Sequence, residues 1–270
     1  MTTKAEFQAA VASLWLDADL AAIGNHPKTS GDLLKFIFSI QQYCAHPNSL
    51  GGAESKKNRH NAWQLLDVNS NSIVSLAEAG KFIKEHLSRF YTGSDNKALG
   101  VDASEADRLY KLFYPCFIRA FLDAADYGSV KKVTRTDGGK SYMCKTIDGD
   151  DYVQYGEFRL FLTYLCIYAT IWEAFGVIDG GKTDIDDRRI SKAEWEANRA
   201  NLIGHPLDSL SVSAGISPDK VFAAMDADGK GMVLLKEFSE YIEDFEYSLG
   251  SRWGKLLNAH EPEKAAPVTE

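Results

Sequence analysis

The stretch Asp67-Val-Asn-Ser-Asn-Ser-Ile-Val-Ser-Leu-Ala-Glu78 has an oxygen-bearing group at each position that a calcium-binding loop requires. Side-chain oxygens stand at positions 1, 3, 5, 9 and 12, and a backbone carbonyl is available at position 7. Calcium takes six to eight oxygen ligands, and a bidentate Glu in the last position closes the cage. The predicted ligands are Asp67, Asn69, Asn71, the Ile73 carbonyl, Ser75 and Glu78.

Position 6 of this stretch departs from the usual pattern. It holds Ser72, whereas calcium loops normally place a Gly there to make a sharp turn with positive φ. The stretch also offers only two carboxylates, which weakens its attraction for a divalent ion. We therefore expect a dissociation constant of about 10⁻⁵ M or weaker. The alternative is an ordinary Asp/Asn/Ser turn that caps the following helix.

A second stretch, Asp226-Ala-Asp-Gly-Lys-Gly-Met-Val-Leu-Leu-Lys-Glu237, follows the same order. Gly231 stands at position 6, as the turn requires. Lys230 at position 5 supplies no acceptor, and Leu234 at position 9 cannot hold the usual water. We expect this loop to bind more weakly than the first or to stay empty. Its predicted ligands are Asp226, Asp228, the Met232 carbonyl and Glu237.

Two further units keep the end of the pattern and lose its beginning. In one, Glu157 stands at position 12, but Thr146 falls at position 1 and cannot replace an Asp well. We expect this unit to be enlarged by the polar segment 127–150 and to be empty. In the other, Asp179 to Glu194 spans 16 residues where 12 are needed. A solvated acidic loop is the preferred interpretation there, with irregular cation binding as the alternative for Asp179, Asp184, Asp186 and Asp187.

Four units thus share one order: an apolar helix, a polar loop, a single aliphatic residue, a Glu and another helix. Internal repetition of this kind is more specific than any single loop. The order is that of EF-hands, which pair because each leaves an apolar face uncovered. We therefore expect Val74 opposite Val153 and Ile190 opposite Val233.

The expected fold is all-α, with two lobes of paired EF-hands, several of them degenerate, and an extra N-terminal helical segment. The predicted division is 1–50 for the N-terminal extension, 51–165 for the first pair, 166–256 for the second pair and 257–270 for a flexible tail. A helix over 157–178 would serve both pairs. Pro115 is expected either to begin a new helix or to kink the one before it.

Two helices are expected before the first hand. Residues 4–23 carry apolar residues at helical spacing, and Ser30 is expected to cap a second helix. The apolar stripe of the second helix consists of Leu33, Leu34, Ile37, Ile40 and Tyr43. Either the two helices pack together, or the first lies in the hydrophobic groove of a hand pair as a target helix would.

The composition argues against several classes of protein. A formal charge of -8 and a pI near 5.3 argue against a general nucleic-acid binder, which would show a basic face. The four cysteines form no Cys-x-x-Cys pair or zinc motif, and we expect reduced, buried thiols. The six histidines are scattered, and neither a phosphate-binding glycine loop nor a hydrolase motif is present, so we do not expect an enzyme.

The sequence also argues against a membrane-spanning protein. The most apolar run, 161–178, contains Glu173, and we expect it to be a buried helix. The N-terminal residues show no secretory signal and no glycine after the first Met, so acylation is not expected. The basic segments 56–60 and 131–135 are expected to be solvated, with peripheral contact to acidic lipid as the alternative.

Several segments between Asp32 and Glu246 resemble the calflagins, the flagellar calcium-binding proteins of trypanosomatids. They are Ala-Glu-Ser-Lys at 53–56, the helix with Pro115 and Arg119-Ala-Phe121, the long insertion in the second hand, and Gly156-Glu-Phe-Arg159-Leu. The resemblance implies an all-helical, two-lobed calcium sensor that associates with the flagellum and, through acylation, with its membrane. This chain lacks the acylated residues, so membrane attachment does not carry over. The third and fourth hands, the main calcium sites of that family, are both altered here.

Two functions are therefore expected. In the first, the chain is a cytoplasmic or flagellar sensor that binds Ca²⁺, with Mg²⁺ as the alternative ion, and presents apolar lobe surfaces to a protein partner. In the second, the hands are degenerate and bind no metal, and the chain is a helical scaffold subunit of a flagellar or cytoskeletal assembly. A calcium-dependent change in tryptophan fluorescence would separate them, because Trp63 lies just before the first loop.

Overall fold

The computed structural model describes residues 23, 25–27, 31–45, 51–92, 103–137, 140–147, 152–180, 188–211 and 217–257, and it describes only the backbone within 126–147. Several predicted features lie outside these residues. They are all but the last residue of the helix over 4–23, the cap at Ser30, the acidic residues Asp184, Asp186 and Asp187, and the tail from 258 onward.

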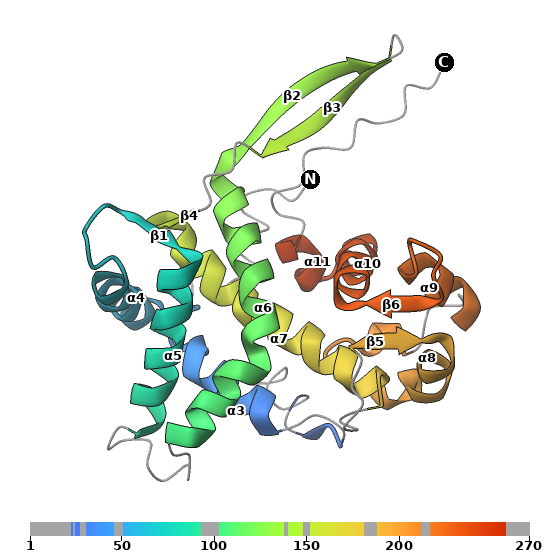
Figure 1. Cartoon of the computed structure of the whole chain (residues 1–270), viewed down its shortest axis with the longest axis horizontal. Coiled ribbons are helices and arrows are strands. Elements are labelled where there is room, and N and C mark those ends of the chain that lie inside the picture. Colours follow the sequence, from blue (N-terminus) through green and yellow to red (C-terminus); the bar gives the residue numbers. More distant parts are fainter. Residues whose placement is uncertain are drawn as a thin grey trace.

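Within this part of the chain, helices dominate, as predicted (Figure 1). The described helices are α3 (Gly31–Gln41), α4 (Gly52–Leu66), α5 (Leu76–Thr92), α6 (Ala103–Ser129), α7 (Tyr155–Ile178), α8 (Lys192–Asn198), α9 (Pro218–Met225), α10 (Leu235–Ser248) and α11 (Arg252–Leu257), with the 3-10 turns η2 (Arg199–Leu202) and η3 (Asp208–Leu210). The described strands are β1 (Ile73–Ser75), β2 (Val130–Asp137), β3 (Lys140–Ile147), β4 (Tyr152–Gln154), β5 (Arg189–Ser191) and β6 (Met232–Leu234).

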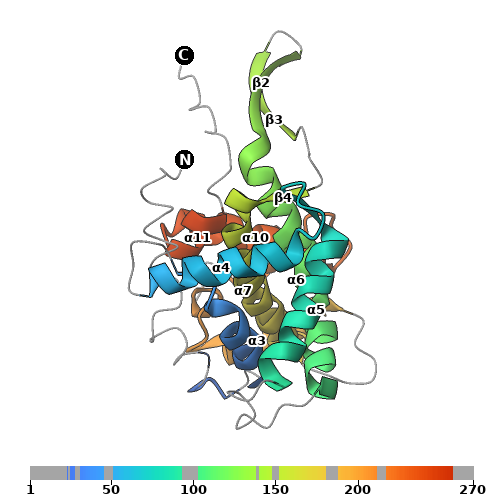
Figure 2. The ribbon, with the colours of Figure 1, turned by 90° about the vertical axis from the view of Figure 1, so that its left-hand side faces the viewer.

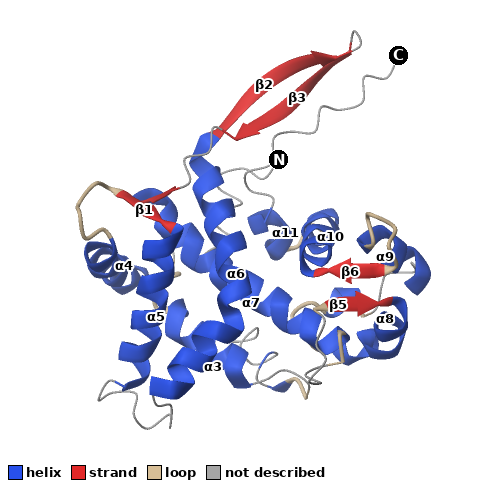
Figure 3. Ribbon diagram, viewed as in Figure 1, coloured by secondary structure: helices blue, strands red, loops and turns tan. Residues whose placement is uncertain are grey.

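Two short antiparallel sheets join loops that are far apart in sequence (Figure 3). In the sheet of β1 and β4, Val74 faces Val153, and in the sheet of β5 and β6, Ile190 faces Val233. Both predicted cross-strand pairs are confirmed. The four side chains are almost fully buried because each strand alternates outward and inward residues, and its central one enters the core.

The segment 127–150, expected to be a polar loop, is mostly regular structure instead. Helix α6 continues to Ser129, and β2 and β3 then form an antiparallel hairpin that projects from the helical body (Figures 1 and 3). Thr146, counted as position 1 of a loop, is paired with Lys131 in this ladder. The signal was present: residues with high strand propensity flank Asp137-Gly-Gly, a sequence that favours a hairpin turn.

Helix α7 lies at the centre of the molecule (Figures 1 and 2). By length and composition it could cross a membrane, but 83% of its most apolar window is buried inside the protein, as expected of a core helix. It contacts both α6 and α10, and it runs through the predicted domain boundary between residues 165 and 166. Within the described residues, the buried apolar side chains form one connected core around it.

Helices α3 and α6 pack against α7. Leu33, Ile37 and Ile40 of the predicted α3 stripe are fully buried, and Leu34 is partly buried. Pro115 lies inside α6 and begins no new helix.

Candidate cation-binding loops

The loops that follow α4 and α9 begin in the same way. Asp67 and Asp226 are the residues at which the two helices end, with ψ angles of 67° and 69°. Their backbone amides still donate to the carbonyls four residues earlier, at 2.8 and 2.9 Å. Each helix therefore delivers a carboxylate directly into the loop that follows it.

Position 6 makes the same turn in both loops. Ser72 has φ 66° and Gly231 has φ 79°, and the amide of each donates to Oδ2 of the first Asp, at 3.0 and 2.8 Å. The positive φ inferred for this position is thus present, although serine carries it in the first loop. A left-handed conformation costs a non-glycine residue about 1 kcal/mol or more.

Three predicted ligands of the first loop lie around one turn. The amide of Asn71 donates to Oδ1 of Asp67 and to Oδ1 of Asn69, both at 3.0 Å, and Oδ1 of Asn71 accepts from the amide of Ile73 at 3.1 Å. These oxygens have further lone pairs, because a carboxylate or carbonyl oxygen accepts more than one bond. The arrangement fits a hard cation, which prefers oxygen ligands.

The Glu that ends each of the four units has a common role. Its Oε2 accepts from the backbone amide three residues earlier, at 2.9 Å for Glu78, 2.8 Å for Glu157, 2.7 Å for Glu194 and 2.9 Å for Glu237. This contact caps the N-terminus of the exit helix. In the first loop, Glu78 also accepts from the Ser75 hydroxyl at 2.8 Å, so these two predicted ligands are in contact.

The fourth loop brings three carboxylates together. One oxygen each of Asp226, Asp228 and Glu237 lies within 4.8 Å of the others. Oδ1 of Asp226 is buried and has no hydrogen-bond partner among the described residues, so a carboxylate lone pair there remains available. Both observations fit a cation with oxygen ligands.

Lys230 partly neutralises this cluster. Its ammonium lies 2.6 Å from Oδ2 of Asp228, and this hydrogen bond lowers the pKa of the Asp228 carboxyl. The absence of an acceptor at position 5 followed from the sequence, but the direct ion pair did not. The lysine places a positive charge where it competes with a bound metal ion.

The two backbone carbonyls predicted as ligands lie in strands. Ile73 and Met232 are the first residues of β1 and β6, where their carbonyls are the candidate ligands. In the second unit, Thr146 is in β3, away from the start of a loop. In the third unit, Asp179 ends α7, and its amide donates to the Phe175 carbonyl at 2.9 Å.

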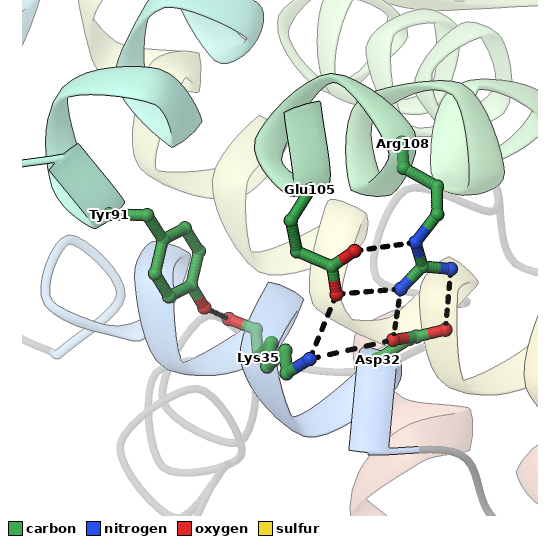
Figure 4. Close-up of polar contacts among 5 residues, drawn as sticks. All are labelled: Asp32, Lys35, Tyr91, Glu105 and Arg108. Carbon is green, nitrogen blue, oxygen red and sulfur yellow. Dashed lines mark hydrogen bonds and ion pairs between the residues drawn. The ribbon is translucent and has the colours of Figure 1, made fainter. Parts of the chain in front are cut away.

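The structure shows a polar cluster that the sequence analysis missed. Asp32, Lys35, Tyr91, Glu105 and Arg108 join α3 to α5 and α6, and we call them the polar clasp (Figure 4). The Arg108 guanidinium binds Asp32 at 2.9 Å and Glu105 at 2.7 Å. Hydrogen bonds from Arg108 and Lys35 lower the pKa of Glu105 to about 2. The only signal in the sequence is a matched spacing: an acid three residues before a base in each helix.

No protein-family model matches this chain, and no curated protein matches it. A functional assignment therefore depends on the chemistry of the loops themselves.

Proposed function

We propose that this protein contains four EF-hand-type units and that two of them bind Ca²⁺, with Mg²⁺ as the alternative ion. The two binding loops are 67–78 and 226–237. One observation supports this most strongly. In both loops the amide at position 6 donates to Oδ2 of the first Asp, across a turn with positive φ. That bond folds the loop back on itself. In the first loop the Asn71 amide also donates to Asp67 and Asn69, and in the fourth loop oxygens of Asp226, Asp228 and Glu237 lie within 4.8 Å of one another.

The two loops differ in the charge they offer. The first provides two carboxylates, Asp67 and Glu78, with amide and hydroxyl oxygens between them. The fourth provides three carboxylates and the opposing charge of Lys230. Affinity depends on ligand charge and site rigidity, so both sites are weak, with dissociation constants of about 10⁻⁵ M or weaker. The units that end in Glu157 and Glu194 bind no ion in this proposal.

Titration calorimetry with calcium tests this proposal. Glu78→Gln is expected to abolish the heat of the first site and Glu237→Gln that of the fourth, because the amide cannot supply a bidentate carboxylate. Glu157→Gln and Glu194→Gln are matched controls, since these residues make the same helix-capping contact. They should leave the calcium heats unchanged. Absence of binding at millimolar calcium, or binding that survives the Glu78→Gln/Glu237→Gln double substitution, would contradict the proposal.

A scaffold without a calcium response is the second candidate. The Lys230–Asp228 ion pair favours it, because the lysine competes with a metal ion. Helix α3 also favours it, because this helix covers the apolar side chains of the first pair of units that a partner would contact. Trp63 distinguishes the two functions, because its ring lies against Phe158 of α7, with centroids 5.5 Å apart. A sensor changes this contact and hence the tryptophan emission when calcium binds, and a scaffold does not. The resemblance to calflagins extends either proposal to a flagellar or cytoskeletal partner in the cytoplasm.

A further inference from the structure

Helix α3 has the anchor pattern of a helix that docks into a groove. Leu33, Phe36, Ile37 and Ile40 have no exposed surface, and their spacing is i, i+3, i+4 and i+7. This is the arrangement by which amphipathic helices insert into hydrophobic grooves of other proteins. The helix precedes the first of the four repeated units, so it is an addition to the repeat and not a member of it.

The groove is formed by helices of the first two units. Helix α3 lies along α7 and against α5 (Figures 1 and 2). The Phe36 ring stacks on Phe113 of α6 at a centroid distance of 4.5 Å, and Phe117 lies 6.1 Å away. The side chains that α3 buries thus meet the apolar faces of three helices from two different units.

The polar clasp holds the N-terminal half of α3 (Figure 4). Asp32 and Lys35 point toward Arg108 and Glu105 at the start of α6, and the Lys35 ammonium lies 2.9 Å from Glu105. Tyr91 of α5 donates its hydroxyl hydrogen to the Lys35 carbonyl. These contacts fix the register of α3, because each base meets an acid from the other helix.

A second set of contacts holds the C-terminal end. The Ser39 carbonyl can only accept, so Nε2 of His86 donates to it at 3.0 Å. Nδ1 of His86 is then the acceptor for the Tyr43 hydroxyl, also at 3.0 Å. Arg59 of α4 donates to the carbonyls of Tyr43 and Ala45. Both ends of α3 are therefore bound by side chains of the first two units.

We propose that α3 is a built-in ligand helix that occupies the partner-binding groove of the first pair of units. A protein partner reaches this groove only by displacing α3 with a helix of the same chemistry. Such a helix carries apolar side chains at the same four positions, and an acid followed three residues later by a base to meet Arg108 and Glu105. The displacement of α3 does not depend on the proposed function. Only assistance of this exchange by cation binding rests on that function.

Native-state hydrogen exchange of the full chain, followed by mass spectrometry in EDTA, tests the proposal. Asp32→Ala removes one ligand from Arg108 and leaves the groove intact. Asp107→Ala is the matched control, because Asp107 also pairs with two bases, Lys84 and Lys111. We expect α3 amides to exchange about fivefold faster in Asp32→Ala, while α5 and α7 are unchanged. Equal acceleration of α3 and α7, or the same α3 rates in both variants, would overturn the proposal.

A labelled peptide of residues 31–45 provides the second readout, by fluorescence anisotropy. The peptide keeps Asp32, whereas the α3 of the Asp32→Ala variant has lost it and competes less well for the groove. The peptide should therefore bind this variant about fivefold more tightly than the wild-type chain, whose own α3 competes from an effectively high local concentration. A peptide with the same residues in scrambled order should not bind. Equal affinity of the native peptide for both proteins would refute displacement. Because both assays are done in EDTA, their failure is distinct from a failure to bind calcium.

Discussion

Ser72 holds a left-handed backbone conformation, with φ 66°, that a glycine would hold without a Cβ clash. We expect Ser72→Gly to stabilise the protein by about 0.5–1 kcal/mol, since the relieved strain exceeds the extra chain entropy of glycine. Urea denaturation measures the difference. Ser88→Gly, inside α5, is the control and should destabilise by about 0.5–1 kcal/mol, because glycine weakens a helix interior. A loss of stability in Ser72→Gly would contradict the strain argument.

Lys230 limits the affinity of the fourth loop. Lys230→Asn removes the ammonium that lies 2.6 Å from Asp228 and adds an acceptor at position 5, so calcium affinity should rise about tenfold. Lys236→Asn is the control. It removes the same charge from the same loop, but its ammonium pairs with Glu240 at 3.8 Å and not with a predicted ligand. Calorimetry should show a smaller gain there, and equal gains in both variants would refute a direct role for Lys230.

The backbone turn at position 6 was predictable because position along the chain determines it. The positive φ at Ser72 followed from the spacing of the loop alone. The polar clasp did not. Asp32 and Arg108 lie 76 residues apart, and nothing local to either residue indicates its partner.

At the scale of elements, α6, α7 and α10 meet around Glu243. Its Oε1 accepts from Arg119 at 3.0 Å and from the Tyr168 hydroxyl at 2.9 Å, and the same two side chains also bind Asp123. Tyr168 has only one hydroxyl hydrogen to share between the two carboxylates. Burial raises the pKa of Glu243 to about 7, so this carboxyl keeps its proton to a higher pH in the folded protein than in the unfolded chain.

This junction should make stability depend on pH. The folded pKa lies above the ordinary value of 4.5, so the contribution of Glu243 is fully present below pH 4.5 and is lost as the pH rises through 7. Relative to Glu243→Gln, the wild-type protein should lose on the order of 1–3 kcal/mol of unfolding free energy between pH 5 and pH 8. Denaturation at several pH values measures this. Glu240→Gln, a more exposed neighbour of Arg119, is the control, and identical pH profiles for wild type and Glu243→Gln would refute the prediction.

Elements with a strong periodic pattern were predictable, whereas one defined by strand propensity was missed. The apolar run of α7 is confirmed as a buried helix. It was predictable because a helix that is apolar on all sides is buried. Segment 127–150 was judged by its polarity. Its residues do not alternate strictly between apolar and polar, so the pattern that reveals core strands is weak there.

At the scale of the whole molecule, the predicted strand pairs are present, and the division into two lobes stays a prediction. Helix α7 is shared by the units before and after it, and the described buried side chains form one core. A sequence pattern identifies units and their neighbours. It does not indicate how two pairs are arranged when one long apolar helix belongs to both.

We propose that two of the four units hold cations, and amide NMR during a calcium titration tests this most directly. The amides of Ser72 and Gly231 donate to the first Asp of each loop, so they report any change in the charge of that carboxylate. Both signals should shift as calcium rises to millimolar concentration, and the Ser72 signal should shift at a lower calcium concentration than the Gly231 signal. The amide signals of Gln154 and Ser191 should not shift. Unmoved Ser72 and Gly231 signals at saturating calcium would contradict the claim.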